Sequence, residues 1–159
     1  MEYTPKNLGH VVMRVRDMDS SLDFYTKVMG LTVMERSLSG TVFMSADTEK
    51  SHELAIRAIG MDANGPNHSI VGQAHMAWQM GTFEDLQELY LRLKENNVRI
   101  IRIGDHGVSL GVYIWDPDDN EIEVYYELPK SDWKSPESKG LFAGSFPKEL
   151  MEPVNSADD

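Results

Sequence analysis

The sequence predicts an α+β protein made of two β-α-β-β-β modules, which form a curved mixed sheet or half-barrel. Three observations support this. A strand-like run that carries a histidine opens each half, at His10 and at His75. A helix-like apolar stripe follows each of these runs, and three further strand-like runs complete each half. The spacing also repeats, since 20 residues separate His10 from Gly30 and 21 separate His75 from Asn96. The pattern therefore indicates an internal repeat.

The first module covers about residues 7–59. A strand is expected over 9–16, where Val11, Met13 and Val15 alternate with a more polar face that includes His10. Asp17 or Asp19 is suited to cap the next helix, and Gly30 suits the position after its end. We expect the apolar stripe of this helix at Leu22, Tyr25, Val28 and Met29. The remaining strands are expected over 31–36, 41–46 and 53–59.

The second module covers about residues 72–127 and follows a linker over 61–71. It begins with a strand over 74–80, and Thr82 can cap the helix after it. The apolar stripe of that helix is Phe83, Leu86, Leu89, Tyr90 and Leu93, and the helix ends at Asn96-Asn97. Strands are expected over 98–103, 112–115 and 121–126, and the last two are joined by the turn Asp-Pro-Asp-Asp-Asn over 116–120.

Side-chain alternation in this last hairpin gathers polar groups. Tyr113 and Trp115 share one face of the first strand, while Glu121, Glu123 and Tyr125 share one face of the second. Asp and Asn in the turn between these strands tolerate the left-handed conformation. A carboxylate, a phenol and a histidine can therefore converge at this hairpin.

Composition restricts the class of protein. The 159 residues suit one domain over 1–127, with a partly flexible extension over 128–159 in which residues 128–133 fold back and the last ten or so are loose. The formal net charge of −11 argues against binding to nucleic acid or to anionic membranes. The chain has no cysteine, so disulfides, thiolate metal sites and a cysteine nucleophile are excluded. Without a predicted membrane span or signal peptide, we expect a cytoplasmic enzyme.

His10, His75 and Glu123 form the main candidate site. Each lies on a strand-like run, on the face opposite an apolar one. Any one of them alone is as well explained as a structural residue, but a carboxylate buried beside two imidazoles needs a partner such as a divalent cation. Two histidines and a carboxylate without thiolate suit Fe(II), Mn(II), Ni(II) or Zn(II). The half-barrel is therefore expected to surround a metal site.

The paired modules, His10 in Leu-Gly-His-Val, His75, and Glu123 after the Asp-Pro-Asp-Asp-Asn turn resemble the vicinal oxygen chelate (glyoxalase/bleomycin resistance/dioxygenase) superfamily over roughly residues 7–127. Within it, the chain resembles single-domain type I extradiol catechol dioxygenases. Three positions carry this closer resemblance: His52 in His-Glu-Leu-Ala-Ile, His106 in Asp-His-Gly-Val-Ser, and Tyr113 ten residues before Glu123. Many such enzymes contain two tandem pairs of modules, whereas this chain has one.

The resemblance implies an Fe(II)-dependent dioxygenase, with Mn(II) as the alternative metal, that cleaves a catechol with O2 in the breakdown of aromatic hydrocarbons. It makes His10, His75 and Glu123 the metal ligands. It implies that His52 hydrogen-bonds the bound oxygen and transfers its proton. His106 would act as an acid or orient the substrate, and Tyr113 would hydrogen-bond the substrate hydroxyl. A small aromatic diol and O2 are the expected partners, and a homo-oligomer, a dimer or larger, is the expected assembly.

Other functions stay open at this stage. His52 and Glu53 are neighbours and point to opposite faces, so only one of them faces the cleft. With Glu53 as a fourth ligand, the site resembles that of glyoxalase-type isomerases or lyases, which would use Ni(II) or Zn(II), or that of fosfomycin-resistance transferases. A non-catalytic protein resembling the bleomycin-binding members is a further alternative, against which the intact ligand set argues. His106 and Tyr113 favour His52, and His68 is interpreted as a loop residue without a role.

Overall fold

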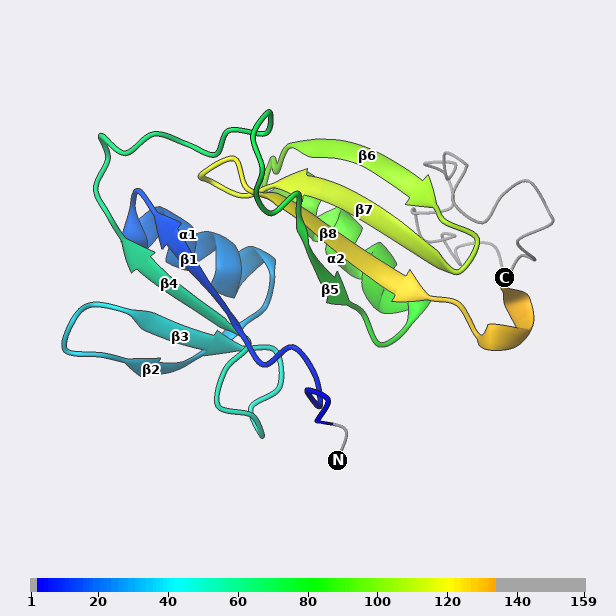
Figure 1. Cartoon of the computed structure of the whole chain (residues 1–159). Coiled ribbons are helices and arrows are strands. Elements are labelled where there is room, and N and C mark those ends of the chain that lie inside the picture. The colour runs from blue at the N-terminus through cyan, green and yellow to red at the C-terminus, as the bar shows by residue number, and fades with distance from the viewer. Residues whose placement is uncertain (1–2, 134–159) are drawn as a thin grey trace, which may run out of the picture. The chain divides into compact units, whose positions relative to one another are not determined.

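The computed structural model describes residues 3–133, and the chain divides into two compact units with the boundary between Gly65 and Pro66 (Figure 1). Each unit contains one four-stranded mixed sheet and one main helix, and the second unit also has a short 3-10 turn. The α+β class and the two β-α-β-β-β modules are thereby confirmed. That the two modules form a single catalytic domain over 1–127 stays a prediction, and the predicted loose last ten residues lie outside the described residues.

The sheet of the first unit has the strand order β1-β4-β3-β2. Its outermost pair, β1 and β4, is parallel and aligns Val11 with Leu54, while the other neighbours are antiparallel. The apolar face predicted for the first strand is confirmed, because Met13 and Val15 are buried together with Ile56 of β4. The strands are β1 (Val11–Val15), β2 (Thr32–Arg36), β3 (Val42–Ser45) and β4 (Leu54–Ala58).

The helix of the first unit changes its winding halfway. It starts as α1 (Met18–Asp23), with the Asp17 carboxylate accepting a hydrogen bond from the Ser20 N–H at 2.7 Å, so Asp17 rather than Asp19 is the cap. It continues as the π-helical turn η1 (Phe24–Val28), in which the Met29 N–H bonds to the Phe24 carbonyl at 3.0 Å. Gly30 follows with a φ of 80°, as its predicted position requires.

The predicted stripe of this helix is wrong at Leu22 and Met29, which are only half-buried. The buried residues are Ser21, Phe24, Tyr25 and Val28. These positions also follow helical spacing, but Ser21 is polar, so the hydropathy pattern does not predict that it is buried. Its small side chain is fully buried, which lets the helix approach its neighbours closely.

The sheet of the second unit has the matching order β5-β8-β7-β6, again with one parallel pair, β5 and β8. Figure 1 shows α2 (Phe83–Glu95) against one face of this sheet. Thr82 and Asp85 form a capping box, and the predicted stripe is buried at Leu86, Leu89, Tyr90 and Leu93. The strands are β5 (Met76–Gln79), β6 (Ile100–Asp105), β7 (Ser109–Trp115) and β8 (Glu121–Glu127).

Several strand boundaries of the second unit differ from the prediction. β5 begins at Met76 rather than at 74, so His75 precedes the strand, and β6 begins at Ile100 rather than at 98. β6 runs to Asp105 rather than ending at 103, and β7 begins at Ser109 rather than at 112. Both extensions arise because β7 lies between two neighbours and pairs along its length with β6 and β8. Gly104 and Gly111 face each other in the added part of this ladder, and glycine is a weak strand signal in a sequence.

The two ends of β8 are fixed locally. The Asp116 carboxylate accepts hydrogen bonds from the N–H groups of Asp118 and Asn120, at 2.9 and 2.8 Å, and Asp119 has a φ of 67°. The predicted turn is thus confirmed. Beyond β8 the Leu128 N–H bonds to the Val108 carbonyl at 2.9 Å, and a short 3-10 turn, η2 (Lys130–Asp132), follows. No helix in residues 3–133 is long and apolar enough to cross a membrane.

Candidate active site

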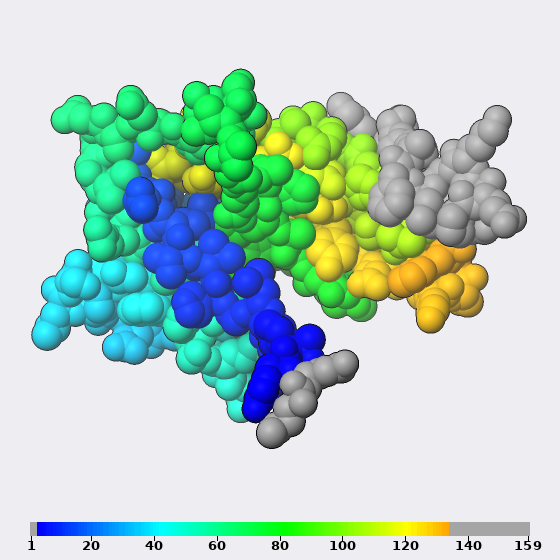
Figure 2. All heavy atoms as spheres, viewed as in Figure 1, coloured from blue at the N-terminus to red at the C-terminus, as the bar shows by residue number. Residues whose placement is uncertain are grey.

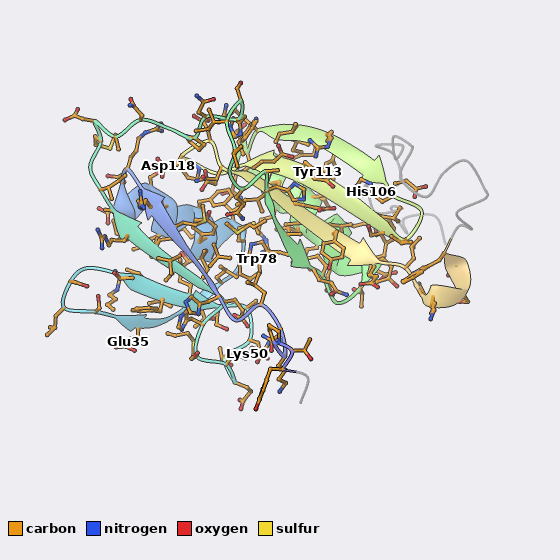
Figure 3. All side chains as sticks on the ribbon, viewed as in Figure 1. Glu35, Lys50, Trp78, His106, Tyr113 and Asp118 are labelled. Carbon is orange, nitrogen blue, oxygen red and sulfur yellow. The ribbon has the colours of Figure 1, made fainter. Side chains whose placement is uncertain are left out.

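Four of the predicted site residues gather in the second unit: His75, His106, Tyr113 and Glu123. Tyr113 on β7 and Glu123 on β8 are direct register partners, so their side chains project from the same face of the sheet. His75 comes immediately before β5, the parallel neighbour of β8, and His106 comes immediately after β6. The labels in Figure 3 locate His106 and Tyr113 on this sheet.

The Glu123 carboxylate is the centre of this group. Its Oε2 lies 3.3 Å from Nε2 of His75, and its Oε1 lies 3.8 Å from Nε2 of His106. The same His106 nitrogen is hydrogen-bonded to the Tyr113 hydroxyl at 2.9 Å. Glu123 is only 8% exposed, and a carboxylate so buried needs charged or hydrogen-bonding partners. Imidazole, carboxylate and phenol thus form one connected polar network.

Tyr113 is held as a neutral phenol. Burial, together with the hydrogen bond and the negative charge of Glu123, raises the pKa of Tyr113 to about 12. Arg102 on β6 opposes this rise, since its guanidinium carbon lies 3.5 Å from the centre of the Tyr113 ring. Arg102 is itself held by an ion pair of 2.8 Å with Glu121. The Tyr113 hydroxyl therefore keeps its proton at neutral pH and can donate it in a hydrogen bond.

Two glycines leave room for this network. A Cβ atom at Gly111 would lie 2.8 Å from Oε1 of Glu123, closer than real Cβ contacts. A Cβ atom at Gly104, the register partner of Gly111, would lie 3.2 Å from Nε2 of His106. The glycine pair thus forms a patch of sheet without side chains, against which the Glu123 carboxylate and the His106 imidazole pack. This patch leaves no signal in the sequence, because a strand glycine carries no chemical group that marks it as part of a site.

The other two predicted histidines lie in the first unit and contact each other. The ring centres of His10 and His52 are 4.6 Å apart, and the Phe43 ring is 4.9 Å from that of His52. His10 precedes β1 and His52 precedes β4, the two parallel neighbours of this sheet. These contacts bring together one predicted ligand and one predicted catalytic residue.

Glu53 is engaged elsewhere. Its Oε2 accepts hydrogen bonds from the Ser45 hydroxyl at 2.5 Å and from the Ala46 N–H at 3.2 Å, while Lys50 lies 3.2 Å from Oε1. Burial alone would raise the pKa of Glu53, but these hydrogen bonds and the lysine charge outweigh it, and the pKa is lowered. The carboxylate that is the alternative fourth ligand thus stabilises the loop between β3 and β4.

The donor chemistry of the second unit suits a divalent metal. Two ligands at adjacent corners of a metal with bonds of about 2.1 Å are about 3 Å apart, which is close to the His75–Glu123 separation. Within residues 3–133, no three histidine, aspartate or glutamate side chains are grouped as a complete metal site. The ligand set of His10, His75 and Glu123 therefore stays a prediction, of which the second unit supplies an adjacent imidazole–carboxylate pair.

Comparison with known proteins identifies the family. Residues 7–124 match the Glyoxalase/Bleomycin resistance protein/Dioxygenase superfamily, and the chain belongs to this superfamily. The chain is 30% identical over 128 residues to catechol-2,3-dioxygenase of Bacillus subtilis, covering 80% of this chain and 44% of that protein. It is also 30% identical over 127 residues to biphenyl-2,3-diol 1,2-dioxygenase 3 of Rhodococcus globerulus, covering 78% and 64%. The matches thus span less than two thirds of these relatives.

Solved structures share the fold. A glyoxalase/bleomycin resistance protein/dioxygenase domain from Frankia matches with a TM-score of 0.69 at 16% identity, over 79% of this chain and all of that one. The fosfomycin resistance protein FosX of Listeria monocytogenes matches with a TM-score of 0.62 at 18% identity, over 81% and 99%. The two mixed sheets are those of the vicinal oxygen chelate fold, which hosts several chemistries, so activity has to be argued from the site.

Proposed function

We propose that the protein is an extradiol dioxygenase that cleaves the ring of a catechol with O2, using Fe(II) or, as the alternative, Mn(II). The observation that carries the proposal is the position of the Tyr113–His106 hydrogen bond beside the His75–Glu123 pair. A proton donor and acceptor lie next to a ligand pair, as an acid–base reaction on a metal-bound diol requires. The similarity to two curated diol dioxygenases supports the same chemistry.

A metal held here would supply a Lewis acid that binds and orients the diol and O2 and carries charge between them. His75 and Glu123 would be two of its ligands, and His10 is the predicted third. The overall reaction is balanced without a further reductant, because both atoms of O2 enter the product as one carbon–carbon bond of the ring breaks. The remaining task of the protein is to place the diol and to hold protons at defined atoms.

Tyr113 and His106 would handle the protons of the substrate. Because the pKa of Tyr113 is about 12, its hydroxyl is a hydrogen-bond donor at working pH and can hold a substrate oxygen in place. Nε2 of His106, 2.9 Å away, can exchange a proton with that hydroxyl or with the substrate. His52 would serve the oxygen side, since its ring contacts that of His10, a predicted ligand.

Oxygen uptake by protein reconstituted anaerobically with Fe(II), over a panel of catechols, tests the proposal. We expect uptake in proportion to a yellow ring-opened product, and loss of both in Glu123→Ala. Glu53→Gln is the matched control, because Glu53 contacts Ser45, Ala46 and Lys50 instead. Metal binding without uptake on any catechol would contradict the proposal and favour an isomerase, lyase or transferase of the same superfamily.

The same preparations test the remaining expectations. Metal affinity should fall in His10→Ala, His75→Ala and Glu123→Ala if all three are ligands. Elution on a sizing column tests the expected homo-oligomer, and location in the cytoplasm is proposed together with the activity.

A further inference from the structure

A cavity of about 400 Å³ opens beside the candidate active site. Its lining comes from the segment 67–74, from Trp115 of β7 and from Glu121 of β8, so it lies entirely within the second unit. In Figure 2 the green atoms of this segment lie next to the yellow atoms of the β7–β8 hairpin. The volume is within the range of sites that bind small molecules, roughly 300–1,000 Å³.

The cavity and the site share one face of the sheet. Trp115 and Glu121 are register partners, and they lie two residues along from Tyr113 and Glu123, which are also partners. Two residues along a strand cover about 7 Å, so a ring held at Tyr113 reaches the cavity through a short substituent. Ala74, which lines the cavity, directly precedes His75. A substrate in the site would thus direct a substituent into this cavity.

Aromatic rings line part of the cavity. The ring centres of His68 and Trp115 are 4.9 Å apart, with their planes tilted by 52°. A flat group can lie against such rings with favourable contact. His68, for which the sequence predicts only a place in a loop, is thus a ring partner of Trp115.

The polar groups of the cavity favour a neutral donor. Arg102 binds Oε1 of Glu121 at 2.8 Å, and Oε2 has no hydrogen-bond partner among the described residues, so it remains an acceptor. Gln73 donates its amide N–H to the His75 carbonyl at 3.3 Å, which leaves its amide oxygen as a second acceptor. A ligand anion would meet the Glu121 carboxylate. A ligand cation would gain little from Glu121, because the Arg102 guanidinium, outside the lining, already balances the charge of that carboxylate.

We propose that this cavity is a specificity pocket for a flat, uncharged substituent on the catechol ring that carries a hydrogen-bond donor, such as an amide N–H or a hydroxyl. Trp115 contacts the plane of this substituent and Glu121 accepts its hydrogen bond. The identity of the ring as a catechol rests on the proposed function. The preference of the pocket for a neutral, planar donor rests on its walls alone.

Binding of simple probes tests the pocket without any turnover. Benzamide, benzoate and benzylamine have similar shape and carry a neutral donor, an anion and a cation. We expect benzamide to shift the NMR signal of the Trp115 indole N–H in the full chain, assigned with Trp115→Phe, and the two charged probes to shift it at least 10-fold less at equal concentration. The signal of Trp133, which does not line the cavity, is the internal control. Equal shifts with all three probes, or none with benzamide, would overturn the proposal.

Turnover gives a second, separable test. Among catechols with substituents of equal length that end in an amide, a carboxylate or an ammonium group, kcat/KM should be at least 10-fold higher for the amide. Trp115→Ala should reduce this preference, whereas Trp133→Phe should not change it. Benzamide binding without cleavage of any catechol would refute the dioxygenase and leave the pocket standing. Cleavage of all three catechols at equal kcat/KM would refute the pocket and leave the dioxygenase standing.

Discussion

The Glu123 carboxylate occupies the space that a side chain at Gly111 would fill. A Cβ atom at position 111 would lie 2.8 Å from Oε1 of this carboxylate. Glu123 is the centre of the polar network and a proposed metal ligand. The end of a flexible side chain moves more easily than the sheet beneath it. A methyl group at this position would therefore displace the carboxylate and leave the strands paired.

We predict that Gly111→Ala lowers metal affinity at least 10-fold while the melting temperature changes little. A tenfold loss corresponds to about 1.4 kcal/mol of binding free energy. Competition with a chromophoric chelator measures the affinity. Gly72→Ala is the matched control, because a Cβ atom there meets nothing within 4 Å. Unchanged affinity in Gly111→Ala would show that the space beside Glu123 has no part in metal binding.

The ionisation of Tyr113 can be followed in metal-free protein. Because its pKa is raised to about 12, the absorbance difference between wild type and Tyr113→Phe at 295 nm should develop only near that pH. The neutral phenol stabilises the fold below about pH 10, where the unfolded chain also keeps its proton. This contribution is lost as pH rises through the folded pKa. Arg102→Met should move the transition higher, since Arg102 lowers this pKa; a transition near pH 10 in wild type would contradict the assignment.

The contribution of Glu53 to stability should be lost as pH falls, whereas that of Tyr113 is lost as pH rises. The pKa of Glu53 is lowered in the folded state, so its contribution is present above the ordinary value near 4.5 and is lost as pH falls through the folded pKa. Wild type should therefore be more stable than Glu53→Gln at pH 7, with the difference shrinking towards pH 3. Urea unfolding at the two pH values measures this. Glu49→Gln, at an exposed position, should show no such dependence, and a constant gap for Glu53→Gln would contradict the prediction.

The capping box of α2 gives a prediction that concerns stability alone. The Thr82 hydroxyl accepts from the Asp85 N–H at 3.1 Å, and the Asp85 carboxylate accepts from the Thr82 N–H at 2.9 Å. Thr82→Ala should cost about 1 kcal/mol and lower the melting temperature by roughly 2–4 °C. The exposed Thr48→Ala should not, and metal affinity should be equal in both variants. Calorimetry compares the three proteins.

The sequence predicted those parts of the fold that leave a periodic signal. Alternation along the first strand and the Asx-rich turn before Glu123 located the strands and placed Tyr113 beside Glu123, as the register confirms. Alternation could not decide between His52 and Glu53, because both precede the regular part of β4 and their side chains are directed by local contacts instead.

Other parts left no signal of their own. The π-helical turn at Phe24–Val28 depends on a carbonyl that bonds one residue further along than usual, which hydropathy does not record. Arg102 is the register partner of Tyr113 because the pairing of β6 with β7 shifts between Ile100 and Arg102, and such a shift leaves no mark in the alternation. The linker predicted over 61–71 supplies part of a cavity wall, at Asn67, His68 and Ile70, because the cavity also needs Trp115 and Glu121 of β7 and β8. These features depend on contacts distant in sequence.

The edge strands of the two sheets also affect the tendency of the protein to aggregate at high concentration. β2 and β6 each end their sheet, and each has a register shift in its pairing, between Val33 and Glu35 and between Ile100 and Arg102. A bulge interrupts the row of free backbone groups that a second chain would need for edge-to-edge addition. Charged side chains stand beside each bulge, so the β2 edge and the β6 edge are protected against edge-to-edge aggregation.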